Sequence, residues 1–135
     1  MVEIAPDYWL GHTALGLVYM RTGNPADAIR ELQWAPLGHY SCGWRGSAHV
    51  LAGEGDKAEE LLRQIENVRQ GQYISSVPAA MIHTQLGDID AAFAHLESSI
   101  RSRDFQLYAL QTEPMFDKLR PDARYQDLLR RMKLA

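Results

Sequence analysis

The chain has 135 residues, a net charge of −3 and one cysteine. A chain of this length forms one domain or a run of small repeats, and the single Cys42 excludes an intramolecular disulfide and a cysteine-based zinc cage. The near-neutral charge argues against broad attraction to nucleic acid, and no apolar run approaches the ~20 residues of a membrane span. Composition therefore predicts a cytoplasmic protein without nucleic-acid or membrane partners.

Residues 8–38 predict the first of three helical hairpins. Apolar residues recur at helical spacing up to about Thr22. Gly23 suits the left-handed conformation that ends a helix, and Pro25 suits the first turn of the next helix. That second helix has one apolar face, formed by Ala28, Ile29, Leu32 and Ala35.

Residues 39–72 and 73–103 repeat this pattern. The three turn glycines, Gly23, Gly53 and Gly87, lie 30 and 34 residues apart. No segment shows the convincing alternation of apolar and polar residues that is typical of a strand. The sequence therefore predicts an all-α fold built from repeated hairpins.

Small residues at matching positions predict close packing inside each hairpin. An alanine follows each turn glycine by five positions, at Ala28, Ala58 and Ala92. Two antiparallel helices approach closely only where side chains are small. We therefore expect these alanines to lie opposite the small residues of the first helices, which are Gly16, Gly46 and Ala80.

Residues 104–135 predict a capping segment. The pattern indicates a short turn and then a helix with Pro121 at its start. The apolar residues expected to face the last hairpin are Tyr125, Leu128, Leu129 and Met132. A terminal repeat needs such a cap because one of its faces is otherwise bare.

Five residues of the first copy carry a family resemblance: Leu15, Gly16, Tyr19, Gly23 and Ala28. Their spacing resembles the tetratricopeptide repeat. The match is good in the first copy, moderate in the third and weaker in the second, where Arg45 stands at a position that the family usually gives to leucine. The resemblance implies an α-α superhelix of helical hairpins with a C-terminal capping helix, in a single domain of residues 1–135.

Both ends of the chain add to this resemblance. Residues 1–7 resemble the tail of a preceding repeat, which favours a chain cut from a longer protein or one that starts where a repeat array would continue. The alternative is that Met1 is a natural start and the local match arises by chance. Residues 113–132 resemble the closing segment of repeat regions in bacterial multidomain signalling and regulatory proteins. None of the catalytic modules of those proteins occurs in this sequence.

The resemblance also implies a concave groove lined by the first helices. The side chains that would line it are Thr13, Leu17, Met20, Arg21, Ser47, Val50, Leu51, Val77, Met81, Thr84 and Gln85, together with Gly43. With one arginine among many apolar or small residues, the groove differs from the carboxylate clamp of chaperone-binding members. The hypothesis is a scaffold that binds a protein or peptide. The chain's own C-terminal helix or a second copy are alternative occupants.

The second hypothesis is a homo-oligomerisation module of a larger signalling or transcription-regulatory protein. Tyr8, Trp9 and Leu10 would be partly bare where a preceding repeat is missing. Bare apolar patches indicate interfaces. A homodimer is therefore a second expectation.

The third hypothesis is a small hydrolase or metal enzyme that uses His39, His49, His83 and Cys42. His49 and His83 share a repeat position, which would place them near each other. Neither has a carboxylate three or four residues further on, so the usual helical metal pairing is missing. Packing roles explain these residues better, and the sequence predicts no enzyme, no metal and no cofactor.

Overall fold

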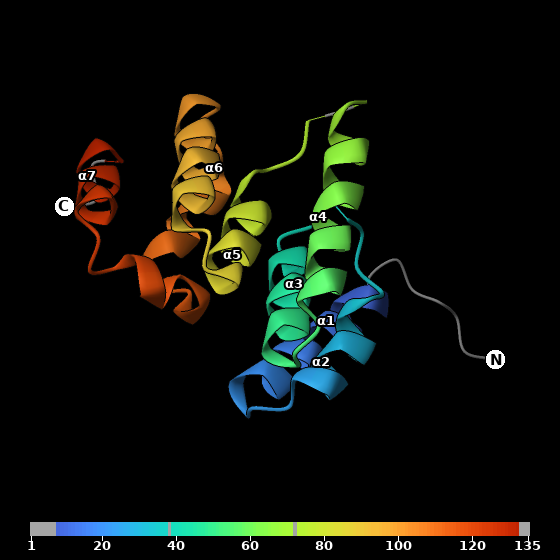
Figure 1. Cartoon of the computed structure of the whole chain (residues 1–135). Helices are drawn as coiled ribbons and strands as arrows, with labels where there is room; N and C mark the ends of the chain where they lie inside the picture. Colours follow the sequence, from blue (N-terminus) through green and yellow to red (C-terminus); the bar gives the residue numbers. More distant parts are fainter. Residues whose placement is uncertain (1–7, 38, 72, 133–135) are drawn as a thin grey trace.

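The computed structural model describes residues 8–37, 39–71 and 73–132. In these residues the chain forms seven α-helices and two 3₁₀ helices, and no strand. The helices pair into hairpins that stand side by side (Figure 1). The predicted all-α superhelix of helical hairpins is confirmed.

Three hairpins come first in the chain, and their helices are followed by a shorter closing segment. The hairpin helices are α1 (Tyr8–Arg21) with α2 (Pro25–Leu32), α3 (Ser41–Leu51) with α4 (Gly55–Arg69), and α5 (Val77–Leu86) with α6 (Ile89–Arg101). The closing elements are η1 (Phe105–Gln111), η2 (Pro114–Leu119) and α7 (Ala123–Arg131). In Figure 1 they follow one another across the molecule, from α1 and α2 at one end to α7 at the other.

The turn inside each hairpin depends on glycine. Gly23, Gly53 and Gly87 have φ angles of 79°, 81° and 87°, in the left-handed region that other residues rarely adopt. At the third turn the Asp88 side chain also accepts a hydrogen bond from the amide of Ala91, at 3.2 Å. The predicted positions of the turns are therefore confirmed.

Close packing at the small residues is confirmed inside the first hairpin and has a different partner in the second. A Cβ atom added at Gly16 would lie 2.6 Å from the Leu32 side chain, so α1 needs a small residue where it meets α2. A Cβ atom at Gly46 would lie 2.4 Å from Ile82, which belongs to α5. The atoms nearest to Gly46 thus belong to the next hairpin, and this residue lets two neighbouring hairpins approach.

The closing segment covers α6 as predicted, although its details differ. Tyr125 and Leu128 of α7 are buried in one cluster with Phe93 and Leu96 of α6. However, α7 begins after Pro121, at the residue that follows the N-cap Asp122.

The predicted turn before α7 contains two 3₁₀ helices. Asp104 begins the first by accepting a hydrogen bond from the Gln106 amide at 2.9 Å. Glu113 begins the second by accepting one from the Met115 amide at 3.0 Å. Both carboxylates are buried, so these caps belong to the interior of the fold.

Candidate interaction surfaces

The predicted groove residues do not line an open surface. Seven of the eleven are buried: Thr13, Met20, Ser47, Val77, Met81, Thr84 and Gln85. Leu17 and Val50 are half-buried, and Arg21 and Leu51 are exposed. The chain itself covers most of these side chains, and a binding groove at the remaining four residues stays a prediction.

Contacts with other parts of the chain explain this burial. Gln85 donates a hydrogen bond from Nε2 to the carbonyl of Met115, at 2.7 Å, which ties α5 to η2. The Met81 side chain packs directly against Gly43, since a Cβ atom added at Gly43 would lie only 2.6 Å from the Sδ atom of Met81. Met81 therefore fills the contact between α3 and α5. The segment η2 therefore packs on this face.

A buried carboxylate, Glu113, is held by side chains from the first two hairpins. Its Oε1 atom accepts hydrogen bonds from Trp44 Nε1 at 2.7 Å and from the Tyr40 hydroxyl at 3.0 Å. Its Oε2 atom lies 3.3 Å from Arg21 Nη2. The Glu113 side chain is 4% exposed, so these donors replace nearly all of its water. We call Glu113 and its three partners the Glu113 network.

The Glu113 network is a carboxylate-binding arrangement. The Arg21 guanidinium supplies a charge-assisted bond, and Tyr40 and Trp44 supply two neutral donors in an edge-to-face pair with ring centroids 5.3 Å apart. Burial, together with the neighbouring Glu113 carboxylate, raises the pKa of Tyr40, so its hydroxyl stays a donor. Sequence reasoning missed this network, since its partners lie 69, 73 and 92 residues from Glu113.

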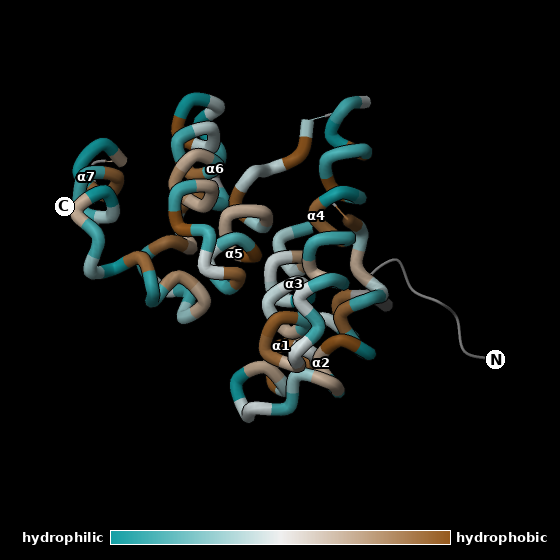
Figure 2. The backbone as a smooth tube through the Cα atoms, in the orientation of Figure 1, coloured by the Kyte–Doolittle hydropathy of each residue, from teal (hydrophilic) through white to brown (hydrophobic). Residues whose placement is uncertain are grey.

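A second surface is the outer side of α1, which carries an apolar stripe. Leu10, Leu15 and Val18 are 45%, 42% and 54% exposed, and Gly11 and Ala14 between them are exposed as well. On a helix these five positions lie on one side. We call them the apolar α1 face. Figure 2 shows hydrophobic residues along α1, whereas α7 at the other end is mostly hydrophilic.

The position of Val18 is covered in both later hairpins. Val18 corresponds to Ala48 of α3 and to Ile82 of α5, and both of these are fully buried. Ala48 packs in one cluster with Ala28 of α2, and Ile82 packs with Ala58 of α4. In the array, therefore, this side of a first helix is normally covered by the hairpin before it.

The predicted contribution of Tyr8 and Trp9 to this surface has no structural outcome, because their side chains lie outside the described residues. Leu10, the third residue of that prediction, is exposed as expected.

Cys42 is a packing residue, as predicted. It is 1% exposed, and its thiol donates to the carbonyl of Pro36 at 3.3 Å. Burial raises the pKa of the thiol to about 11, which keeps it protonated near neutral pH. His39 lies against Ser41, with 2.8 Å between Nδ1 and Oγ.

The two histidines of the repeat position each lie near the acidic residue that begins the following helix. His49 Nδ1 is 2.9 Å from Glu54, and His83 Nδ1 is 3.8 Å from Asp88. The ring of His83 stacks on His95, with centroids 5.2 Å apart. Among the described residues, no three His, Cys, Asp or Glu side chains are placed to hold a metal ion.

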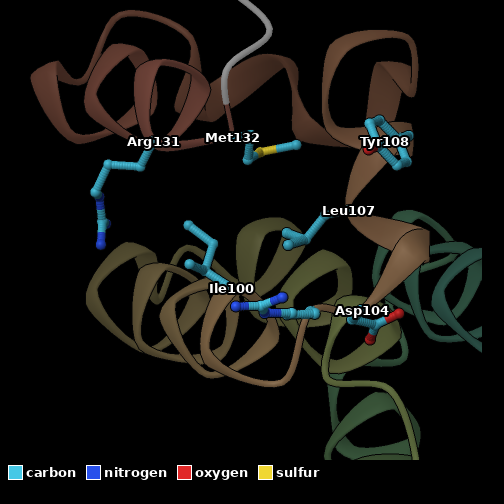
Figure 3. A pocket seen from close by; sticks show the side chains of 7 residues that line it. Ile100, Asp104, Leu107, Tyr108, Arg131 and Met132 are labelled. Carbon is cyan, nitrogen blue, oxygen red and sulfur yellow. The ribbon is translucent and has the colours of Figure 1, made fainter.

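A cavity of about 320 Å³ lies between the end of α6, η1 and the end of α7 (Figure 3). Its apolar lining includes Ile100, Leu107 and Met132. Two of its polar groups have partners: Asp104 accepts a hydrogen bond from the Tyr73 hydroxyl at 3.1 Å, and Arg131 pairs with Asp127 at 3.0 Å.

Comparison with known proteins agrees with this architecture. The family model of the tetratricopeptide repeat matches residues 9–34 and again residues 39–64, which correspond to the first hairpin and most of the second. These two matches support a tetratricopeptide-repeat family for the chain. No curated protein and no solved structure matches the chain. None of the helices in the described part of the chain is long and apolar enough to cross a membrane.

Proposed function

We propose that the chain is a protein–protein interaction module that binds a helical partner on the apolar α1 face. Tetratricopeptide repeats generally mediate protein interaction and scaffolding. The observation that carries the proposal is the 54% exposure of Val18 at a position whose counterparts in the later hairpins, Ala48 and Ile82, are fully buried, next to the exposed Leu10 and Leu15.

The apolar α1 face offers useful binding energy. Burial of a whole leucine or valine side chain contributes about 1.5–3 kcal/mol. Since each of the three side chains is about half exposed, covering what remains contributes about 1 kcal/mol per residue. A helix has a matching shape, because helices α2 and α4 supply residues that cover the counterparts of Val18 on α3 and α5.

We propose a second, smaller surface on the concave side. The predicted groove residues that are not buried are Leu17, Arg21, Val50 and Leu51. Leu51, which is 54% exposed, favours this surface for a protein or peptide ligand.

Two single variants distinguish these surfaces in a pull-down from lysate. Val18→Glu places a charge on the apolar α1 face, and Leu51→Glu places one on the concave side; both residues are 54% exposed, so each variant is the matched control of the other. Circular dichroism first verifies that both variants fold. We expect Val18→Glu to lose the partners that wild type and Leu51→Glu retain. If only Leu51→Glu loses the partners, the concave side is the binding surface. If wild type and both variants recover the same partners equally, neither surface binds them.

A further inference from the structure

The two ends of the superhelix have opposite surface chemistry. The outer side of α7 exposes Gln126 and Arg130. Arg130 pairs there with Asp127, at 3.2 Å. Stacking the apolar α1 face of one copy on α7 of another would bury these charges against aliphatic side chains, which is costly. Head-to-tail association into an open filament is therefore disfavoured.

The apolar α1 face is, in contrast, compatible with itself. Its residues Leu10, Gly11, Ala14, Leu15 and Val18 carry no charge. Two such faces related by a two-fold axis bring apolar groups together without opposing like charges, and an isologous contact of this kind closes after two copies.

Gly11 adds an independent observation. It lies within α1 and is exposed, and a Cβ atom added there would meet no described atom within 4 Å. Gly16, Gly43 and Gly46 all differ, because an added Cβ atom would clash with a neighbouring side chain. Glycine inside a helix costs about 0.5–1 kcal/mol relative to alanine. Among the residues that the structure describes, no contact compensates for this cost at Gly11, whereas a second helix that approaches closely at this point would.

We propose that the occupant of the apolar α1 face is a second copy of this chain, in a two-fold dimer whose two α1 helices cross near Gly11 and Ala14. The inference rests on the docking surface proposed above and names its partner. Because α1 has 14 residues, the contact is about 21 Å long. A specific complex buries at least about 1,000 Å² in total, and a contact between two single helices is at or below that limit. We therefore expect a weak, reversible dimer, with a dissociation constant in the micromolar range or above.

Sedimentation equilibrium of the full chain tests this proposal. Between about 1 µM and 1 mM, the wild-type mass is expected to rise from 15.3 kDa towards twice that value. Val18→Glu is expected to remain at 15.3 kDa throughout. Tyr108→Glu, a matched control at an exposed side chain of η1, is expected to behave as wild type.

Gly11→Leu makes the test more specific. There is space for its Cβ atom in the monomer, and the leucine side chain adds apolar area to the face. If the two α1 helices cross at Gly11, this variant raises the dissociation constant of the dimer at least tenfold, although its monomer folds well. Stronger association in this variant would overturn the crossing at Gly11.

A wild-type chain that stays monomeric at every concentration would overturn the dimer. So would equal association of wild type and Val18→Glu. If the wild-type chain is monomeric but Val18→Glu still loses its lysate partners, the proposed function stands and the occupant is another helical protein.

Discussion

The substitution Glu113→Ala tests how much the Glu113 network contributes to the stability of the fold. In Glu113→Ala, Tyr40 and Trp44 lose the acceptor of their hydrogen bonds, and Arg21 loses its ion pair across the superhelix. Each buried donor without a partner costs about 1–3 kcal/mol. The amide of Met115 also loses its cap, which costs about 1 kcal/mol.

The expected loss of unfolding free energy in Glu113→Ala is about 3 kcal/mol. We use the lower end of the range per donor because Tyr40 and Trp44 are half-buried and Arg21 is 38% exposed, so water can replace part of what is lost. Glu113→Gln, which keeps the shape and an acceptor, is expected to lose about 1–2 kcal/mol.

Urea unfolding followed by circular dichroism and tryptophan fluorescence measures these losses. With a slope of about 2 kcal/mol per molar urea, Glu113→Ala lowers the midpoint by about 1.5 M. Glu60→Ala is the matched control, because Glu60 forms an exposed ion pair with Arg63 at 2.8 Å, which is expected to contribute less than about 1 kcal/mol. If Glu113→Ala lowers the free energy of unfolding by no more than Glu60→Ala, the Glu113 network does not stabilise the packing of η2 against the first two hairpins.

Three further predictions concern packing and pH. Gly46→Ala is expected to destabilise the chain by about 1–3 kcal/mol, because the new Cβ atom would lie 2.4 Å from Ile82; a neutral result in thermal unfolding would contradict the close approach of α3 and α5. Gly11→Ala, measured in the dilute monomer, is expected to stabilise it by about 0.5–1 kcal/mol, since the new Cβ atom has space; destabilisation would mean that α1 is packed differently. Burial lowers the pKa values of His83 and His95 from 6.5, so the unfolded chain binds more protons there as the pH falls below about 6.5. The unfolding free energy should therefore decrease from pH 7 to pH 5, and the double variant with phenylalanine at both positions should show a smaller decrease; an unchanged slope would refute the role of these histidines.

Local sequence signals predicted the hairpins well. A turn glycine acts through its own backbone, so Gly23, Gly53 and Gly87 could be recognised without knowledge of their surroundings. The apolar face of α7 could be recognised in the same way, because Tyr125 and Leu128 lie one turn apart on a single helix. Its exact start could not, since both Pro121 and Asp122 are suitable residues at a helix N-terminus.

Contacts between distant segments could not be predicted from the sequence. Glu113 looks like an ordinary acid before a proline, and its burial depends on Arg21, Tyr40 and Trp44 from two other hairpins. The partner of Gly46 is also a matter of packing between hairpins, since either α4 or α5 would explain a small residue there. For the same reason the predicted groove residues were assigned to an open face that η2 covers.

The most direct test of the apolar α1 face as the docking surface is amide NMR of the wild-type chain between about 10 µM and 1 mM, a range that spans a micromolar equilibrium. We expect the amide chemical shifts of α1 to change with concentration, most strongly at Gly11, Ala14 and Val18, and those of Leu51 and Tyr108 to stay unchanged. Shifts centred on the concave side, or spectra that do not change with concentration, would contradict self-association through this face.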